Sequence, residues 1–294
     1  MQLQEVEIVP EIKLIDEKYF NVENLSDYNL QLSWSPTRVD FCVIDSRNNR
    51  CLYLEENKID ELVNANEITN WLEQLFDSHH FLKAGFWKSI QLSVKNEKFT
   101  LIPTPLFIPE CKKEYLQFNC TLKSSERTAF FHHKALNITS VFAYPVNVVE
   151  WLNSQYPQKK VHLVHHTSAF LEGVMRETSN DTEIGVYANV ENELLTLVVK
   201  KGNNLEFCNN FSYKTNEDVL YYMLFVLDQL KLKKNTILTC WGNVDVDSDL
   251  SNLLTTYIRQ LEIGSRPNMF FYSYVFDELA EQRHFDLLSM KLCL

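Results

Sequence analysis

Glycine is scarce in this chain of 294 residues, which contains six glycines. Loops that cradle phosphates depend on glycine, because a side chain blocks the approach of backbone amides to the anion. The chain contains neither a G-x-x-x-x-G-K-[ST] pattern nor a G-x-G-x-x-G pattern. A phosphate-binding loop of the P-loop or Rossmann type is therefore excluded.

Clusters of basic residues and long apolar segments are also missing. Lys and Arg number 28 against 39 Asp and Glu, which gives a formal net charge of -11. Such a charge repels phosphate backbones, so we expect no nucleic-acid binding. The longest strongly apolar run, residues 219–227, has about half of the roughly 20 residues that cross a bilayer, so we expect no membrane insertion.

The seven cysteines contain no C-x-x-C pair, and several of them lie inside apolar strand patterns. Buried free thiols of this kind are typical of a reducing compartment. The first residues carry acids where an export signal has basic residues followed by an apolar core. We therefore expect a cytoplasmic localisation.

What the chain does contain is ample core material, with 45% hydrophobic and 13% aromatic residues. The clearest pattern lies between residues 184 and 242. Three strands are predicted there from IGVYANV, LLTLVVKK and LEFCNNFSY. A helix capped by Thr215 and ending at Leu230 follows, and then a buried strand, TILTCWG. This helix is apolar nearly all the way round, so we expect it to lie between two layers.

The same arrangement occurs earlier in the chain. NLQLSWSP, VDFCVID and RCLYLEE predict three strands, and a helix with one apolar stripe is expected from Glu67 to Asp77. The two copies are offset by about 155 residues, which is a spacing of ordinary domain size. We predict residues 1–29 to be an N-terminal arm or edge strand, residues 30–180 a first lobe and residues 181–294 a second lobe. The boundary is expected in the polar stretch at residues 178–182.

Other predicted elements fill the space between and after the repeats. We expect strands at residues 86–94 and 98–107, a hairpin around Leu136 and Asn137, and a helix at residues 247–261. The late run MFFYSYVF would place aromatic rings on both faces of a strand. We assign most of these rings to the core, with one face left as the alternative for contact with a partner.

Two lobes that each begin with a three-strand meander, followed by helix, strand and helix, resemble the actin-like ATPase fold of actin, sugar kinases and Hsp70 chaperones. The segments LQLSWSPTRVDFCVID, RNNRCLYLEE, HHTSAF and HFDLLS also resemble an uncharacterised bacterial family with that fold. The actin-like assembly proteins of type IV pili and type II secretion are related to it in fold. The resemblance implies an α/β protein with a duplicated, ribonuclease H-like fold, in which each lobe has a mixed sheet flanked by helices.

In active members of that fold, an Asp-x-Gly turn in each lobe binds phosphate. The corresponding segments here lack this pair: the first has Ser33 and Ser35, and the second has Tyr187 and Asn189. The adenosine-binding Gly-Gly of the fold corresponds to Gly242 and an asparagine. We interpret these five residues as positions of a degenerate nucleotide site without a bound cofactor. Bulky side chains such as Trp34 and Tyr187 are candidates to fill the cleft.

Other polar groups are better explained without catalysis. The histidine doublets at residues 79–80, 132–133 and 165–166 lack the spacing of a zinc site, so we expect no metal and half-buried or exposed imidazoles. Three aspartates at residues 245–249 lack the glycine and glutamate of a calcium loop, and Ser248 or Asp249 is expected to cap a helix. Ser168 has no G-x-S-x-G context, so we assign it to helix capping.

These observations favour a non-catalytic actin-like protein that serves as a cytoplasmic scaffold for protein interaction or assembly. Its protein partners are not identified by the sequence, and a homodimer is one of the assemblies to consider. The alternative is an active ATP-binding phosphotransferase or ATPase with displaced catalytic acids, for which Asp40, Asp45 and Glu191 are the candidates. A third hypothesis is a small-molecule binding module that uses the cleft between the lobes.

Overall fold

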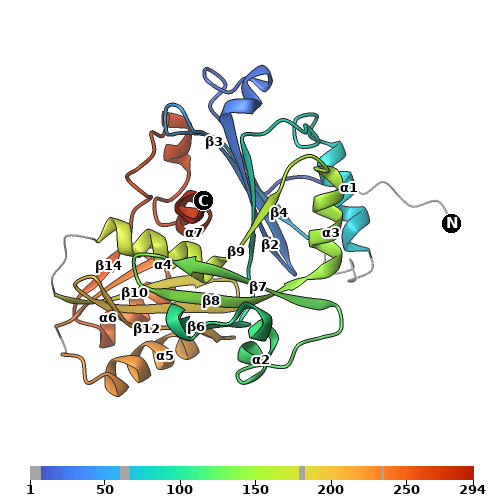
Figure 1. The fold of residues 1–294 in the computed structure, drawn as a ribbon. Coiled ribbons are helices and arrows are strands. Elements are labelled where there is room, and N and C mark those ends of the chain that lie inside the picture. Colours follow the sequence, from blue (N-terminus) through green and yellow to red (C-terminus); the bar gives the residue numbers. More distant parts are fainter. Residues whose placement is uncertain (1–7, 60–66, 179–182, 234) are drawn as a thin grey trace.

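The structure is a computed structural model that describes residues 8–59, 67–178, 183–233 and 235–294. Its described residues form a six-stranded, a five-stranded and a three-stranded sheet with helices on their faces. Figure 1 shows the blue strands of the first large sheet above the yellow and orange strands of the second. The predicted α/β fold with a mixed sheet in each repeat is confirmed.

The six-stranded sheet contains the first meander. Neighbouring strands of this meander pair antiparallel, whereas β5 pairs in parallel with β2 and β9 pairs in parallel with β5. The meander strands are buried along most of their length, which explains their continuous apolar sequences. In sheet order the strands are β1 (Ile12–Ile15), β4 (Arg50–Lys58), β3 (Arg38–Asp45), β2 (Tyr28–Ser35), β5 (Ser89–Val94) and β9 (Val161–His165), with the 3-10 helix η1 (Val22–Asp27) before β2.

Two helices, α1 (Ile68–Asp77) and α3 (Val146–Gln155), cover one face of this sheet, as Figure 1 shows. The helix that the sequence predicted at residues 67–77 is therefore confirmed. All five residues of its predicted apolar stripe are buried, because they are the side that contacts the sheet. These residues are Ile68, Trp71, Leu72, Leu75 and Phe76.

The five-stranded sheet contains the second meander and has the predicted order of elements. Helices α5 (Asn216–Gln229) and α6 (Asp249–Tyr257) pack on one of its faces. The predicted cap of α5 is present: Thr215 accepts a hydrogen bond from the Asp218 amide, and Asp218 accepts one from the Thr215 amide. In sheet order the strands are β12 (Asn204–Ser212), β11 (Leu194–Lys201), β10 (Ile184–Glu191), β13 (Ile237–Gly242) and β14 (Leu261–Ile263).

A small three-stranded sheet forms a separate layer. Its β7/β8 hairpin turns at Asn137, which has a φ of 53°, as the sequence predicted for this site. The predicted strand at residues 98–107 is too long, since it ends at Pro103, where a 3-10 turn begins. The elements are β6 (Phe99–Pro103), η2 (Thr104–Leu106), η3 (Pro109–Cys111), α2 (Lys112–Gln117), β7 (Glu126–His133) and β8 (Ile138–Pro145).

Helix α4 (His166–Glu177) joins the two large sheets. Its Ala169 belongs to the core beside the first sheet, and its Phe170 belongs to the core beside the second. Helix α7 (Phe285–Ser289) packs against α4, and Figure 1 shows both helices between the sheets. The chain after β14 thus returns to the first sheet, through η4 (Tyr274–Glu278), α7 and η5 (Met290–Cys293). The predicted boundary at residues 178–182 lies mostly outside the described residues.

Three predictions about elements in the second half are wrong. Helix α5 is not enclosed between layers, because Tyr221 is 60% exposed and Phe225 is 44% exposed. The helix expected at residues 247–261 ends at Tyr257, and the last of these residues starts β14. The run MFFYSYVF forms a single backbone bridge and a 3-10 turn rather than a strand.

Candidate functional site

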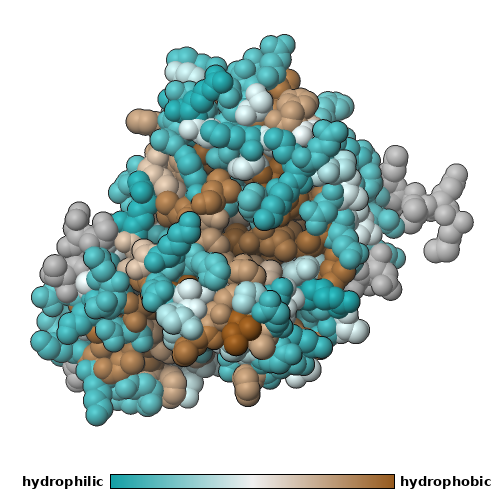
Figure 2. Space-filling model, viewed as in Figure 1, coloured by the Kyte–Doolittle hydropathy of each residue, from teal (hydrophilic) through white to brown (hydrophobic). Residues whose placement is uncertain are grey.

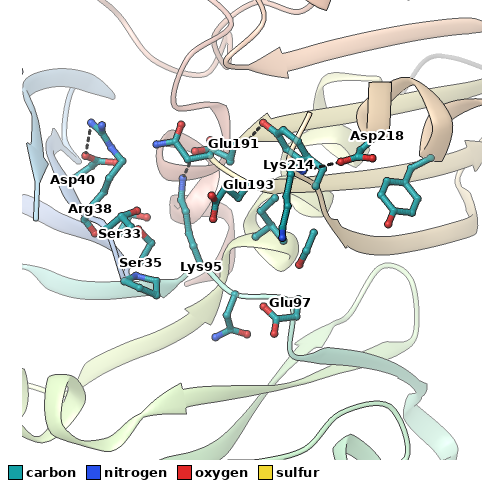
Figure 3. Close-up of a pocket in the computed structure, with 18 residues that line it drawn as sticks. Ser33, Ser35, Arg38, Asp40, Lys95, Glu97, Glu191, Glu193, Lys214 and Asp218 are labelled. Carbon is teal, nitrogen blue, oxygen red and sulfur yellow. Dashed lines mark hydrogen bonds and ion pairs between the residues drawn. The ribbon is translucent and has the colours of Figure 1, made fainter. Parts of the chain in front are cut away.

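The β2/β3 hairpin and the β10/β11 hairpin face a shared cleft between the two large sheets. The cleft has a volume of about 490 Å³, and Figure 3 shows the side chains that line it. Its other walls come from residues 95–97 after β5, residues 212–214 at the end of β12, and Asp218 and Tyr222 of α5. A volume of this size lies within the range of ligand pockets.

The first hairpin contributes Ser33 and Ser35, as expected from the comparison with phosphate-binding turns. Ser33 is 2% exposed and pairs with Asp40 across the β2/β3 ladder, so the two side chains share one face. Ser35 donates a hydrogen bond to the Arg38 carbonyl over 3.4 Å. Pro36 lines the cleft next to them and has no amide hydrogen to donate to a phosphate.

The strand predicted from IGVYANV is confirmed and extends one residue further, to Glu191. Tyr187 and Asn189 lie inside β10, and the turn consists of Asn192 and Glu193, whose φ is 58°. Neither Tyr187 nor Asn189 lines the cleft; Glu191, Asn192 and Glu193 do. The main chain of the hairpin is fixed by Tyr213, whose hydroxyl donates to the Glu191 carbonyl over 2.5 Å.

The expectation that Trp34 and Tyr187 fill the cleft is wrong. The Trp34 ring packs beside α1 and α3, on the core side of β2. Tyr187 packs against Trp241, with 6.3 Å between ring centroids, in the core beside α4. Side chains alternate along a strand, so the Trp34 ring faces away from Ser33 and Ser35. Tyr187 is on the same face of β10 as Glu191, but it lies four residues further from the hairpin turn and does not line the cleft. The cleft is lined mainly by polar and charged side chains, together with the rings of Tyr213 and Tyr222.

Gly242, the glycine aligned with the adenosine-binding motif, has a structural role. Its φ is 86°, and a Cβ atom at this position would lie 2.1 Å from the Val190 carbonyl oxygen. The following amide, that of Asn243, donates to the same oxygen over 2.6 Å. Close approach of β13 to the end of β10 therefore explains why glycine stands here.

A buried lysine at the floor of the cleft joins the second hairpin to α7. Lys95 Nζ lies 2.9 Å from Asp286 Oδ2 in α7 and 3.2 Å from Glu191 Oε2 in the second hairpin. Burial lowers the pKa of Lys95, but Asp286 and Glu191 outweigh it, so that the pKa lies above its usual value. Burial and the charge of Asp286 raise the pKa of Glu191, which Lys95 opposes. Among the described residues, neither oxygen of Asp286 accepts a well-formed hydrogen bond, so Lys95 alone offsets its charge.

A second ion-pair cluster borders the cleft around Glu56, which is 1% exposed. Arg38 reaches Glu56 at 2.7 Å, and Arg283 and His284 reach it at 3.0 Å and 2.8 Å. Burial raises the pKa of Glu56, but the hydrogen bond from His284 and the three cationic partners hold it at about 2. The cluster joins the first sheet to the segment before α7.

The charges that line the cleft are predominantly negative, with five carboxylates against three cations. Of the acids proposed as displaced catalytic groups, Asp40 and Glu191 line the cleft. Asp45 lies elsewhere, in the β3/β4 turn, where it accepts a hydrogen bond from the Arg47 amide over 2.8 Å. The two cations nearest the hairpins, Arg38 and Lys95, are already in ion pairs. This balance of charge is unfavourable for a bare polyanion.

Lys95 and Asp286 were not identified from the sequence. A lysine directly after the buried strand SIQLSV was the available signal, since a charge at that place needs a partner. Asp286 gave no comparable signal, because it lies nearly 200 residues further along the chain.

Comparison with known proteins gives this arrangement a family. Residues 16–261 match the family described as protein of unknown function, DUF3822. The chain belongs to the DUF3822 family. The sequence finds no match among curated proteins.

Solved structures show the fold that this DUF3822 protein shares. A Bacteroides thetaiotaomicron protein with actin-like ATPase fold and unknown function is 20% identical, with 94% of this chain and 99% of that chain covered and a TM-score of 0.80. PilM, solved in a complex with PilN of type IV pilus biogenesis, is 10% identical, with 90% and 98% covered and a TM-score of 0.60. The ethanolamine utilization protein EutJ from Carboxydothermus hydrogenoformans is 7% identical, with 91% and 90% covered and a TM-score of 0.50. The predicted resemblance to an uncharacterised actin-like family is confirmed.

The histidines of this DUF3822 protein are more buried than the sequence suggested. His133, His165 and His166 have no exposed surface, and the prediction of half-buried or exposed imidazoles is wrong for them. His166 Nε2 contacts the Asn96 carbonyl at 3.2 Å, and burial followed by the charge of Lys95 lowers its pKa to about 3. In the described ranges, no three His, Cys, Asp or Glu side chains come together in a way that could hold a metal ion.

Ser168 does not cap α4, which begins after His165 without a side-chain cap. Its hydroxyl instead lies 3.3 Å from Nε2 of His133, whose Nδ1 is 2.6 Å from Glu172. This order of hydroxyl, imidazole and carboxylate is that of a hydrolase triad. Ser168 is however 1% exposed and does not line the cleft, so a substrate has no access to it. Ser248 caps α6, as predicted, by accepting from the Ser251 amide.

Within the described ranges, no helix of this DUF3822 protein has both the length and the apolar character needed to cross a membrane.

Proposed function

We propose that this DUF3822 protein is a non-catalytic member of the actin-like fold that acts in the cytoplasm as a scaffold for protein contacts. The observation that carries the proposal is the ion pair of Lys95 with Glu191 and Asp286, which occupies the floor of the cleft between the hairpins. A nucleotide bound with its magnesium ion would have to displace this ion pair. Its phosphates would then lie close to the remaining carboxylates of the cleft. The absence of the Asp-x-Gly pair from both hairpins supports the same conclusion.

Two further observations support a role in protein contacts. Helix α5 carries Tyr221 and Phe225, which are exposed and stack with 6.0 Å between ring centroids. Exposed aromatic rings of this kind are enriched where proteins bind one another. In addition, the structure of PilM, which is similar in fold, was solved in a complex with another protein, PilN.

Isothermal titration with ATP and magnesium tests the loss of nucleotide binding. We expect no binding tighter than about 10 µM, the affinity that corresponds to roughly 7 kcal/mol. Binding tighter than this limit would refute the proposal. If ATP is also hydrolysed, and if Asp40→Asn or Glu191→Gln abolishes hydrolysis, the protein is an active phosphotransferase with displaced acids.

The scaffold role is tested separately by capture of partners from the native cell. Proteins held by the wild type should be lost with Tyr221→Ser/Phe225→Ser. Phe118→Ser is the matched control, because Phe118 is 86% exposed and lies next to α2, outside the second sheet. Equal capture by all three proteins would argue against α5 as the contact surface.

A further inference from the structure

A groove lies at the C-terminal ends of α5 and α6, on the helical face of the second sheet. Its volume of about 730 Å³ is within the range of ligand-binding pockets. Figure 2 shows hydrophobic side chains among hydrophilic ones at the lower left, where α5 lies in Figure 1. The apolar residues that line the groove are Leu224, Leu227, Leu232, Tyr257 and Ile258. Tyr257 is 59% exposed, so part of this apolar surface is open to solvent.

The charged residues of this groove are predominantly basic, in contrast to the protein as a whole. Three cations, Lys231, Lys233 and Arg259, line it against one acid, Asp228. The whole chain has a formal net charge of -11. All three cations are exposed, and none of them forms an ion pair with a carboxylate of the described residues. An acidic partner would therefore meet positive charge here that the protein itself does not neutralise.

The local structure explains why cations stand at this place. The Leu232 amide donates to the Leu227 carbonyl over 2.9 Å, so Lys231 and Lys233 flank a leucine that packs on the core of the second sheet. Arg259 comes two residues after the end of α6. Cations are favourable near helix C-termini, because the last carbonyl groups carry partial negative charge. This preference accounts for the sign of the charges, but not for the exposed apolar groove beside them.

The apolar surface continues from the groove onto the exposed side of α5. Tyr221 precedes Leu224 by three residues, so the two side chains are neighbours on one face of the helix. The Tyr221 ring stacks on Phe225, and the two residues are 60% and 44% exposed. A small amphiphile in the groove would leave these rings uncovered, whereas a polypeptide several helical turns long covers both. An amphipathic helix presents apolar side chains on one face and charged side chains on the other, which matches this surface.

We propose that the groove between α5 and α6 binds an acidic amphipathic helix of a partner protein. The apolar side chains of that helix contact the leucines of the groove and the exposed rings of α5, and its carboxylates pair with Lys231, Lys233 and Arg259. An amphipathic helix with its apolar face in a groove is a recurring form of peptide recognition. The inference rests on the proposed scaffold role and adds the chemistry of the partner.

The test is fluorescence anisotropy of a labelled peptide titrated with the full-length protein. The peptide has about 16 residues, with leucine at helical spacing on one face and glutamate on the other. We expect saturable binding even though both molecules are acidic, and a loss of affinity of about tenfold or more in Lys233→Glu/Arg259→Glu, because two attractions become repulsions.

Two controls separate the groove from general effects. Lys58→Glu/Lys160→Glu changes the net charge by the same amount at two exposed lysines beside strands of the first sheet, and it should bind the peptide like the wild type. A peptide with the same residues in scrambled order has no apolar face, so it should bind about tenfold more weakly or not at all.

Four outcomes would overturn the inference. The first is the absence of saturable binding up to about 1 mM, the weak end of the ordinary affinity range. The second is an equal loss of affinity in both double variants, which would assign binding to net charge. The third is equal binding of the scrambled peptide. The fourth is binding of dodecanoate but not of the peptide, with loss in Lys233→Glu/Arg259→Glu, which would assign the groove to a lipid anion.

Failure of this inference is distinguishable from failure of the scaffold role. If the peptide does not bind but Tyr221→Ser/Phe225→Ser still loses its native partners, the chemistry of the partner is wrong and the scaffold role stands. Tight binding of ATP would refute the proposed function independently of the peptide.

Discussion

Replacement of Lys95 by methionine should destabilise the protein strongly. Lys95 is 8% exposed, and its ammonium group is the charge that offsets both Asp286 and Glu191. Removing one partner of a buried ion pair leaves an uncompensated charge and costs about 3–5 kcal/mol. Since two carboxylates lose their partner here, we expect a value at the upper end of that range.

Urea unfolding followed by tryptophan fluorescence measures this loss in the free energy of unfolding. Lys83→Met is the matched control, because Lys83 pairs with Glu73 and Asp77 on the surface and should lose at most about 1 kcal/mol. The double variant Lys95→Met/Asp286→Asn removes one of the stranded charges, so it should recover part of the loss.

The pH dependence of the Lys95→Met variant provides a second readout. Burial and Asp286 already hold the pKa of Glu191 above its ordinary value, and loss of Lys95 raises that pKa further. A raised folded-state pKa favours folding at low pH, and this contribution is lost as pH rises through that pKa. The deficit of the variant should therefore shrink between pH 7 and pH 5. A loss below about 1 kcal/mol at pH 7, or a deficit that does not change with pH, would refute the assignment of Lys95 as the charge that holds Glu191 and Asp286 together.

Three further predictions concern stability. Gly242→Ala should cost about 2 kcal/mol or more in urea unfolding, because alanine is strained at a φ of 86° and its Cβ would meet the Val190 carbonyl, whereas Gly85→Ala, with no atom within 4 Å, should be near neutral. Stability should also fall in acid: the pKa of Glu56 is lowered from 4.5 to about 2, so its contribution is present above pH 4.5 and lost as pH falls to 2. His166 acts earlier, since the unfolded chain takes up its proton near 6.5 and the folded protein near 3, so acid unfolding of His166→Gln should begin at lower pH than that of the wild type.

The sequence predicted the elements well where a local pattern matched a local environment. The buried strands of both meanders and the stripe of α1 follow from alternation and helical spacing, which reflect contact with a sheet. It failed where exposure depended on distant elements. The apolar sequence of α5 predicted burial on all sides, yet no described element covers Tyr221 and Phe225. Likewise, the aromatic run after Asn268 does not form a strand. Its backbone pairs with the first sheet at one position, where Phe271 forms a single bridge with Arg50.

The residues of the candidate site were predicted where they adjoin a local turn signal, and were missed where they depend on distant segments. Ser33 and Ser35 were located correctly, because they adjoin a turn marked by proline. Tyr187 and Asn189 lie in the predicted strand but outside the cleft, which the second hairpin lines with Glu191, Asn192 and Glu193. Whether the nucleotide site is inactive remains a prediction for titration.

By itself, the sequence determined the repeated strand and helix order and the lack of glycine at the hairpins, because both are written in neighbouring residues. Only the tertiary structure decided what occupies the cleft between them. Lys95, Glu191 and Asp286 come from three distant segments, and ion pairing depends on distance in space and on burial, neither of which neighbouring residues encode.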